Sequence, residues 1–107
     1  MIFVSMTIDA KPGERDRLAA AMAEMMAETR REPGCVVYTY SGDLGEPDRF
    51  HLCEMWDSLP VMEAHINAAH SARFVAVLNE TARISSLKAF GGDVEKVRIP
   101  APESRLG

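Results

Sequence analysis

The segment 50–70, FHLCEMWDSLPVMEAHINAAH, constrains the fold most strongly, because it changes from a strand pattern to a helix pattern within a few residues. Side chains of a strand alternate between its two faces, so one face of this strand carries Phe50, Leu52, Glu54 and Trp56. Three of the four are apolar or aromatic, and we expect that face to be buried. A carboxylate on a buried face is costly unless it is hydrogen-bonded or paired, so Glu54 needs a partner.

A short helix follows this strand. Ser58 can cap it and Pro60 suits its first turn, which predicts a helix from Pro60 to about Ala68. On that helix His65 lies on the same face as Met62 and Ala69, toward the apolar layer. The helix that carries His65 thus follows directly after the strand that carries the only tryptophan.

Periodicity and turn residues predict the other elements. Strands are expected over 1–10, 35–43, 49–57 and 94–99, with a further short strand suggested over 87–90. Helices are expected over 14–32 and from about residue 70 to an end between 79 and 86. This order predicts an α+β, ferredoxin-like βαββααβ sandwich with an antiparallel sheet, formed by a single domain over 1–99 and followed by a polar tail over 100–107.

The helices of such a sandwich cover only one face of the sheet. The other face would carry Cys35, Val37, Cys53 and Met55, and a large apolar face left in water is unfavourable. We therefore expect a homodimer in which two copies pack sheet against sheet.

Charge and composition exclude several classes of protein. The 107 residues carry a net charge of −4 with no basic run, which argues against binding to nucleic acid or anionic membranes. No apolar stretch is long enough to span a bilayer and no signal peptide is present, so we expect a cytoplasmic protein. We expect Cys35 and Cys53 to be reduced, buried thiols that behave as small apolar residues.

A metal site is not expected. His65 and His70 are five residues apart, so on a continuous helix their side chains would diverge by roughly 140°. This is not the four-residue spacing of a zinc-binding helix.

An ordered set of residues resembles the antibiotic biosynthesis monooxygenase domain over residues 2–99. After a Pro-Gly that follows the first strand, the set is Glu32-Pro33-Gly34-Cys35, Tyr38, Phe50, Glu54-Met55-Trp56, His65 and Phe74. The resemblance implies a dimeric α+β barrel. Some members of the family oxygenate quinols or aromatic polyketide intermediates with molecular oxygen and without metal, flavin or haem, whereas others have no assigned activity.

Oxygenation without a cofactor requires an apolar cavity, a group that accepts a proton from a phenol or quinol, and donors that stabilise the resulting oxyanion. His65 is the candidate base, because histidine titrates in the right range. Trp56 would line a cavity between sheet and helices, and Glu54 would orient His65 or a substrate hydroxyl. The substrate pocket would be completed by Tyr38, Tyr40, Phe74 and Met62. The aromatic residues could instead serve only in core packing, and His65 could only tie its helix to the sheet. Glu54 could simply pair with an arginine or cap backbone amides.

Two classes of function remain. The first is a cofactor-independent monooxygenase that acts on a small aromatic or quinol substrate. The second is a non-catalytic dimeric module that binds a small ligand, which a filled interior with no room for an aromatic ring would favour. Haem degradation is disfavoured, because the resemblance to haem-degrading enzymes calls for an asparagine on the first strand, where this chain has Val4-Ser5-Met6-Thr7.

Overall fold

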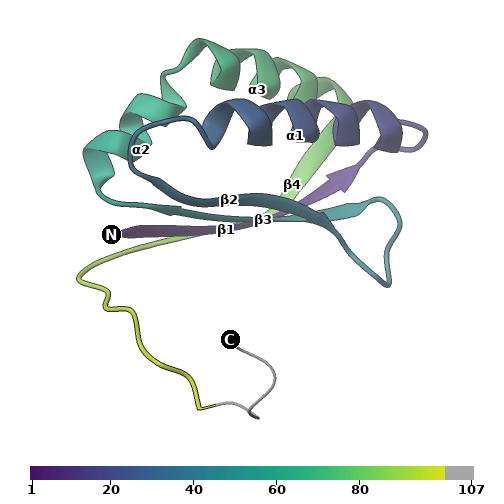
Figure 1. The fold of residues 1–107 in the computed structure, drawn as a ribbon. Coiled ribbons are helices and arrows are strands. Elements are labelled where there is room, and N and C mark those ends of the chain that lie inside the picture. Colours follow the sequence, from purple (N-terminus) through teal and green to yellow (C-terminus); the bar gives the residue numbers. More distant parts are fainter. Residues whose placement is uncertain (101–107) are drawn as a thin grey trace.

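The computed structural model describes residues 1–100, in which three helices cover one face of a four-stranded sheet (Figure 1). The elements are β1 (Ile2–Ala10), α1 (Arg15–Thr29), β2 (Cys35–Gly42), β3 (Arg49–Trp56), α2 (Leu59–Ile66), α3 (Ala69–Thr81) and β4 (Ala82–Gly91). The order βαββααβ predicted from the sequence is confirmed.

The strands lie in the order β2-β3-β1-β4, and every neighbouring pair is antiparallel. β1 and β2 therefore run parallel with β3 between them, joined by α1, which is the split βαβ arrangement of ferredoxin-like folds. The register places Val4 of β1 opposite Glu54 of β3. The predicted ferredoxin-like fold is thus confirmed.

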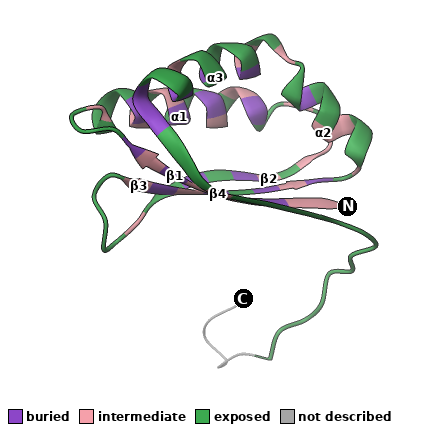
Figure 2. Cartoon of the chain, turned by 180° about the vertical axis from the view of Figure 1, so that it is seen from behind, coloured by how far each residue is buried: buried purple, intermediate pink, exposed green. Residues whose placement is uncertain are grey.

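The core lies between the helices and the sheet, and the buried residues of both layers are coloured purple in Figure 2. α1 contributes one stripe at helical spacing, which consists of Leu18, Met22, Met25 and Thr29. The alternation predicted for β3 is present: Phe50, Leu52, Glu54 and Trp56 are all buried.

The strand predicted over 94–99 was wrong, whereas the short strand suggested over 87–90 lies within β4. Residues 82–91 form β4 beside β1, and residues 93–99 have no strand structure. β4 continues directly from the end of α3 without a turn, so no break in the sequence marks its start. Its pairing with β1 contains a register shift that leaves Ser85 as an extra residue. This bulge breaks the period-two pattern, so that Ile84 and Leu87 lie on the same face of the sheet although they are three residues apart. A spacing of three between apolar residues of one face resembles a helix.

A second bulge changes the faces expected for β2. Cys35 pairs with Trp56 and Val37 pairs with Met55, so Val36 is the extra residue on β2. Cys35 therefore packs against the core, whereas Val36 is 48% exposed. The sequence pattern had placed Cys35 on the uncovered face of the sheet and Val36 on the face toward the helices.

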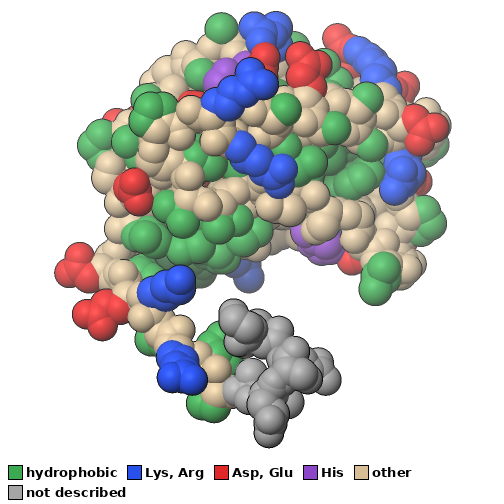
Figure 3. Space-filling view, viewed as in Figure 1, with side chains coloured by type: hydrophobic (Ala, Val, Ile, Leu, Met, Phe, Trp, Pro, Cys, Tyr) green, Lys and Arg blue, Asp and Glu red, His purple; other side chains and the backbone are tan. Residues whose placement is uncertain are grey.

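No helix or strand of residues 1–100 covers the sheet face opposite the helices. Cys53 lies on this face and is exposed, so the prediction that both cysteines are buried was wrong for Cys53. Apolar side chains gather at one end of this face, beside the start of the segment that leaves β4 (Figure 3). They are Met1, Phe3, Met55, Phe90 and Val94, and the rings of Phe3 and Phe90 lie 6.5 Å apart.

Beyond β4 the chain extends away from the sheet on its uncovered side (Figure 1). Apart from Pro100, the predicted tail over 100–107 lies outside the described residues.

Within residues 1–100, no helix has the length and apolar character needed to cross a bilayer.

The turn between α1 and β2 depends on Gly34. Its φ of +81° lies in the left-handed region, and a Cβ atom there would come within 2.8 Å of the Val61 side chain on α2. We expect Gly34→Ala to lower the free energy of unfolding by about 2–3 kcal/mol, from backbone strain and the clash together. Urea denaturation measures this loss.

Gly13→Ala is the matched control, because Gly13 has a φ of +80°, but a Cβ atom added there would meet no atom of residues 1–100 within 4 Å. In this variant only the backbone strain should lower the free energy of unfolding, by about 1 kcal/mol. Equal losses in the two variants would contradict a clash at Val61.

Candidate active site

The predicted site residues form one cluster under the helices. The indole of Trp56 is 0% exposed and its centroid lies 4.6 Å from that of the His65 imidazole. The Tyr38 ring lies 5.4 Å from the His65 ring, centroid to centroid. Tyr40 contacts Phe74 with ring centroids 5.6 Å apart, and the Tyr38 and Tyr40 hydroxyls are 3.2 Å apart. Met62 is partly buried and packs against the same core.

Glu54 has the partner that its buried position requires. The Trp56 Nε1–H donates to Glu54 Oε1 at 2.8 Å, and His65 Nε2 lies 4.0 Å from the same oxygen. Burial raises the pKa of the Glu54 carboxyl above its usual range, and the Trp56 hydrogen bond and the nearby His65 oppose that rise. Glu54 thus occupies the interior between the only tryptophan and the candidate base.

The two tyrosines are held as neutral phenols. Burial raises the pKa of both hydroxyls well above the ordinary value for tyrosine. Each can therefore donate a hydrogen bond from its O–H at neutral pH, but neither can act as a phenolate. In this structure they bond to one another.

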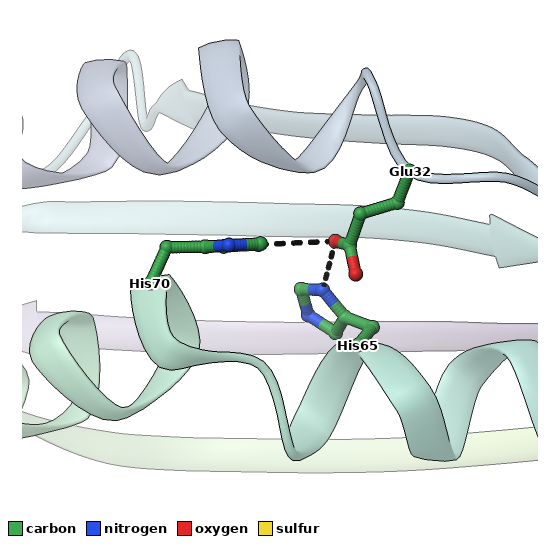
Figure 4. A group of neighbouring side chains, drawn as sticks. All are labelled: Glu32, His65 and His70. Carbon is green, nitrogen blue, oxygen red and sulfur yellow. Dashed lines mark hydrogen bonds and ion pairs between the residues drawn. The ribbon is translucent and has the colours of Figure 1, made fainter.

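Sequence reasoning missed two residues of the site, Glu32 and His70. Glu32 lies in the turn after α1, and its Oε2 is 2.7 Å from His65 Nδ1 and 3.1 Å from His70 Nε2 (Figure 4). The helix ends at Ile66 and a new one starts at Ala69, so the two histidines are not on a continuous helix and their rings converge. The Ser71 hydroxyl donates to the main-chain carbonyl of His65 at 2.5 Å across this break.

Glu32, His65 and His70 are also the residues that could hold a metal ion, since one ligand atom from each lies within 4.8 Å of the others. The angular argument against such a site assumed a continuous helix and does not apply. However, two ligands at ~2.0–2.1 Å from a tetrahedral zinc ion lie roughly 3.3 Å apart. The 2.7 Å between Glu32 Oε2 and His65 Nδ1 is shorter and is that of a hydrogen bond.

A groove of about 220 Å³ opens between α1 and α3, on the helix side of the molecule. His70, Arg73 and Phe74 line it from α3, and Met25 and Glu28 line it from α1. Of the predicted pocket residues, only Phe74 lies in its wall. The space beside the indole, where a substrate cavity was expected, is occupied by the side chains of His65 and Glu54 in the single chain.

Replacing Glu54 by glutamine is expected to raise the melting temperature at about pH 8 and to leave it unchanged at about pH 4. The raised pKa means that the folded state binds the proton of the Glu54 carboxyl more tightly than the unfolded chain does. The wild type therefore loses stability as the pH rises through the pKa that Glu54 has in the folded state. Glutamine has no such proton, and its Oε1 can still accept from Trp56. Each kcal/mol gained raises the melting temperature by about 4–8 °C, which calorimetry can measure.

The control for this prediction is Glu24→Gln, on the exposed surface of α1, which should change little at either pH. A gain from Glu54→Gln of equal size at both pH values would show that ionisation of Glu54 is not its cause.

Comparison with known proteins agrees with the fold and the sequence pattern. The model of the antibiotic biosynthesis monooxygenase family matches residues 1–77, and the chain belongs to this family. The resemblance drawn from its residues is thereby confirmed.

Two curated relatives are similar to the chain. A Bacillus subtilis protein, YcnE, whose name proposes a monooxygenase, is 29% identical over 76 residues, which cover 71% of this chain and 80% of that protein. An uncharacterised Synechocystis protein, sll1783, is 27% identical over 74 residues, which cover 69% of this chain. The match spans only half of the length of the Synechocystis protein.

Solved structures share the fold. A conserved protein of unknown function from Bacteroides thetaiotaomicron is 28% identical, with a TM-score of 0.78 over 83% of this chain and 94% of that one. A Deinococcus radiodurans protein named for antibiotic biosynthesis monooxygenase has a TM-score of 0.83 over 94% of this chain and all of that one. Its identity of 24% supports the fold alone.

Proposed function

We propose that this protein is a monooxygenase that oxidises a small aromatic or quinol substrate with molecular oxygen and without a cofactor. The observation that carries the proposal is the arrangement of His65. Glu32 accepts from Nδ1 on one side of the ring, and Nε2 is directed toward Glu54 beside Trp56. When a carboxylate accepts the hydrogen of one ring nitrogen of a neutral histidine, the other ring nitrogen is free to accept a proton.

In the proposed reaction, Nε2 of His65 takes the proton of a phenolic hydroxyl. The electron-rich anion then passes an electron to oxygen, and the two radicals combine. One oxygen atom enters the ring at a C–H carbon, and the ring gives up two hydrogen atoms to become a quinone. These two hydrogen atoms leave with the other oxygen atom as water. The substrate supplies all the electrons, so the step needs no external reductant. The neutral hydroxyls of Tyr38, whose ring lies 5.4 Å from that of His65, and of Tyr40 would donate to the developing oxyanion.

An oxygen electrode tests this function. The purified protein, treated with a chelator, is offered a panel of dihydroxyaromatic compounds, and the uptake is compared with the autoxidation of each compound alone. We expect at least one compound to be consumed faster in the presence of the protein. No acceleration across the panel would count against the proposal.

The filled interior favours one alternative function, a non-catalytic dimeric module that binds a small ligand elsewhere. Trp56 has no exposed surface and His65 is buried, so a ring beside them must displace side chains. The NMR signal of the Trp56 indole N–H discriminates the two functions. A substrate in the proposed site shifts this signal, whereas a ligand held only in the groove between α1 and α3 leaves it in place.

We further propose that two copies form a dimer through the uncovered sheet face. The support is the apolar character of that face, with the rings of Phe3 and Phe90 6.5 Å apart at one end and Cys53 and Met55 on β3. Sedimentation velocity should give the mass of a dimer for the wild type. Met55→Lys should shift it toward a single chain, because a buried unpaired charge is costly.

Leu44→Lys is the control for the dimer, since Leu44 is a fully exposed apolar residue in the hairpin turn between β2 and β3. It adds the same charge and should leave the dimer intact. A wild-type protein that sediments as a single chain would contradict the dimer.

The proposed location is the cytoplasm. Cys35 and Cys53 are free thiols, and Cys53 is exposed in the single chain. A reducing compartment keeps such thiols from forming disulfides.

A further inference from the structure

Glu32 is the point at which two histidines meet. Its Oε2 is in hydrogen-bond contact with His65 Nδ1 at 2.7 Å and with His70 Nε2 at 3.1 Å (Figure 4). An ionised carboxylate can only accept hydrogen bonds, so each of these ring nitrogens must carry the hydrogen. The neutral ring of His65 is then protonated at Nδ1 and bare at Nε2.

The burial of the three side chains increases inward. His70 is 18% exposed at the groove, Glu32 is 16% exposed, and His65 is 8% exposed beneath them. Glu28 Oε2 lies 3.7 Å from His70 Nδ1 and also pairs with Arg73. Glu28 thus lies on the outer side of His70, and His70 contacts Glu32 on its inner side.

The other polar groups that face His65 do not supply a second acceptor for Nδ1. Glu54 of β3 lies on the Nε2 side, at 4.0 Å. The Trp56 N–H is directed to Glu54, and the Tyr38 hydroxyl is bonded to that of Tyr40. Glu32 is therefore the carboxylate that determines which nitrogen of His65 is protonated.

We propose that Glu32 is a positioning residue that fixes the tautomer of His65, with its basic Nε2 toward Glu54, and that His70 holds Glu32 in place for this role. The catalytic part of this inference rests on the proposed monooxygenase function, whereas the tautomer does not. A fixed tautomer matters because the imidazole can accept a substrate proton only at the nitrogen that lacks one, and a wrong tautomer costs up to ~10⁴ in rate in other histidine–carboxylate enzymes.

Nitrogen-15 NMR of the histidine rings tests the tautomer directly. His51 provides an internal comparison, because its ring is held the other way: Nε2 lies 2.7 Å from Asp43 Oδ2. In the neutral rings we expect His65 to be protonated at Nδ1, and His51 and His70 to be protonated at Nε2. A wild-type His65 protonated at Nε2 would overturn the proposal.

Variants separate positioning from a merely structural role. Glu32→Leu removes the acceptor and should give His65 a mixture of tautomers, while Glu32→Gln, whose amide oxygen still accepts, should retain most of the Nδ1–H form. Asp43→Leu should alter His51 and leave His65 unchanged. Backbone NMR spectra establish that each variant is folded, and a folded Glu32→Leu protein with unchanged His65 would overturn the proposal.

Exogenous carboxylate provides a second readout. Glu32→Ala leaves a gap beside the groove, and His70 at its edge is reachable from solvent. We expect acetate to restore the Nδ1–H signal of His65 in Glu32→Ala, and to have no effect on His51. If Glu32→Ala keeps the Nδ1–H form of His65 without acetate, the carboxylate does not set the tautomer.

Kinetics then test the catalytic part. With a substrate identified, Glu32→Leu should lower kcat by about 10²–10⁴ with little change in KM, and Glu32→Gln should recover part of the loss. If NMR shows the expected tautomer but no substrate is consumed, the proposed function fails and the positioning of His65 stands. If the tautomer changes and kcat does not, the catalytic role of Glu32 is contradicted.

Discussion

Trp56→Ala is expected to lower the free energy of unfolding by about 3–5 kcal/mol, the usual cost of emptying a large aromatic site in a core. The indole has no exposed surface, packs against His65 and Tyr38, and donates its N–H to Glu54. Its loss therefore leaves both a cavity and a buried carboxylate without its donor. Urea denaturation followed by circular dichroism measures the change.

A variant this destabilised can fail to fold, since small domains are stable by only about 5–15 kcal/mol. Trp56→Phe keeps most of the ring and removes the N–H, so it should cost about 1–3 kcal/mol, the usual penalty for an unsatisfied buried group. Leu44→Ala, in an exposed turn, should cost less than about 0.5 kcal/mol. A Trp56→Phe protein as stable as the wild type would contradict the hydrogen bond to Glu54.

His65→Gln is expected to lower kcat for the proposed oxygenation by about 10²–10⁴, the usual contribution of a positioned acid–base group. Glutamine can still donate to Glu32, so the packing between α2 and the turn after α1 is retained, but it has no basic nitrogen. Oxygen uptake under saturating substrate measures the effect.

His51→Gln is the matched control, because His51 lies on the outward side of β3 and pairs with Asp43 and Thr7. It should keep wild-type kcat. If both variants retain full activity, His65 is not the proton acceptor, whatever its position in the fold.

Much of the fold could be predicted because its strongest signals are local. The alternation of Phe50, Leu52, Glu54 and Trp56 specifies one buried face of a strand, and the stripe of Leu18, Met22 and Met25 specifies a one-sided helix. The structure has both. Together with the turn residues these patterns determine the order of elements, and hence the ferredoxin-like sheet.

The two errors in the strands have a common cause. A β-bulge shifts the alternation by one residue without any mark in the sequence, at Val36 in β2 and at Ser85 in β4. The first exchanged the expected faces of Cys35 and Val36. The second made β4 resemble a continuation of the helix, so the last strand was expected over 94–99 rather than over 82–91.

The site could be predicted only in part. His65, Glu54 and Trp56 follow from one strand and the helix after it, so their proximity can be predicted from neighbouring positions in the sequence. Glu32 lies 33 residues before His65, and His70 reaches Glu32 only because the helix breaks between Ile66 and Ala69. The turn residues Pro33 and Gly34 marked the position of Glu32, but no periodic pattern links it to a histidine.

Labelling with ¹⁸O₂ tests the central claim most directly. Chelator-treated protein is given an accepted dihydroxyaromatic compound under labelled oxygen, and the product is analysed by mass spectrometry. The account predicts that one labelled oxygen atom enters the product, with one molecule of oxygen consumed for each molecule of substrate. A product that carries no label, or that takes its oxygen from labelled water instead, would contradict it.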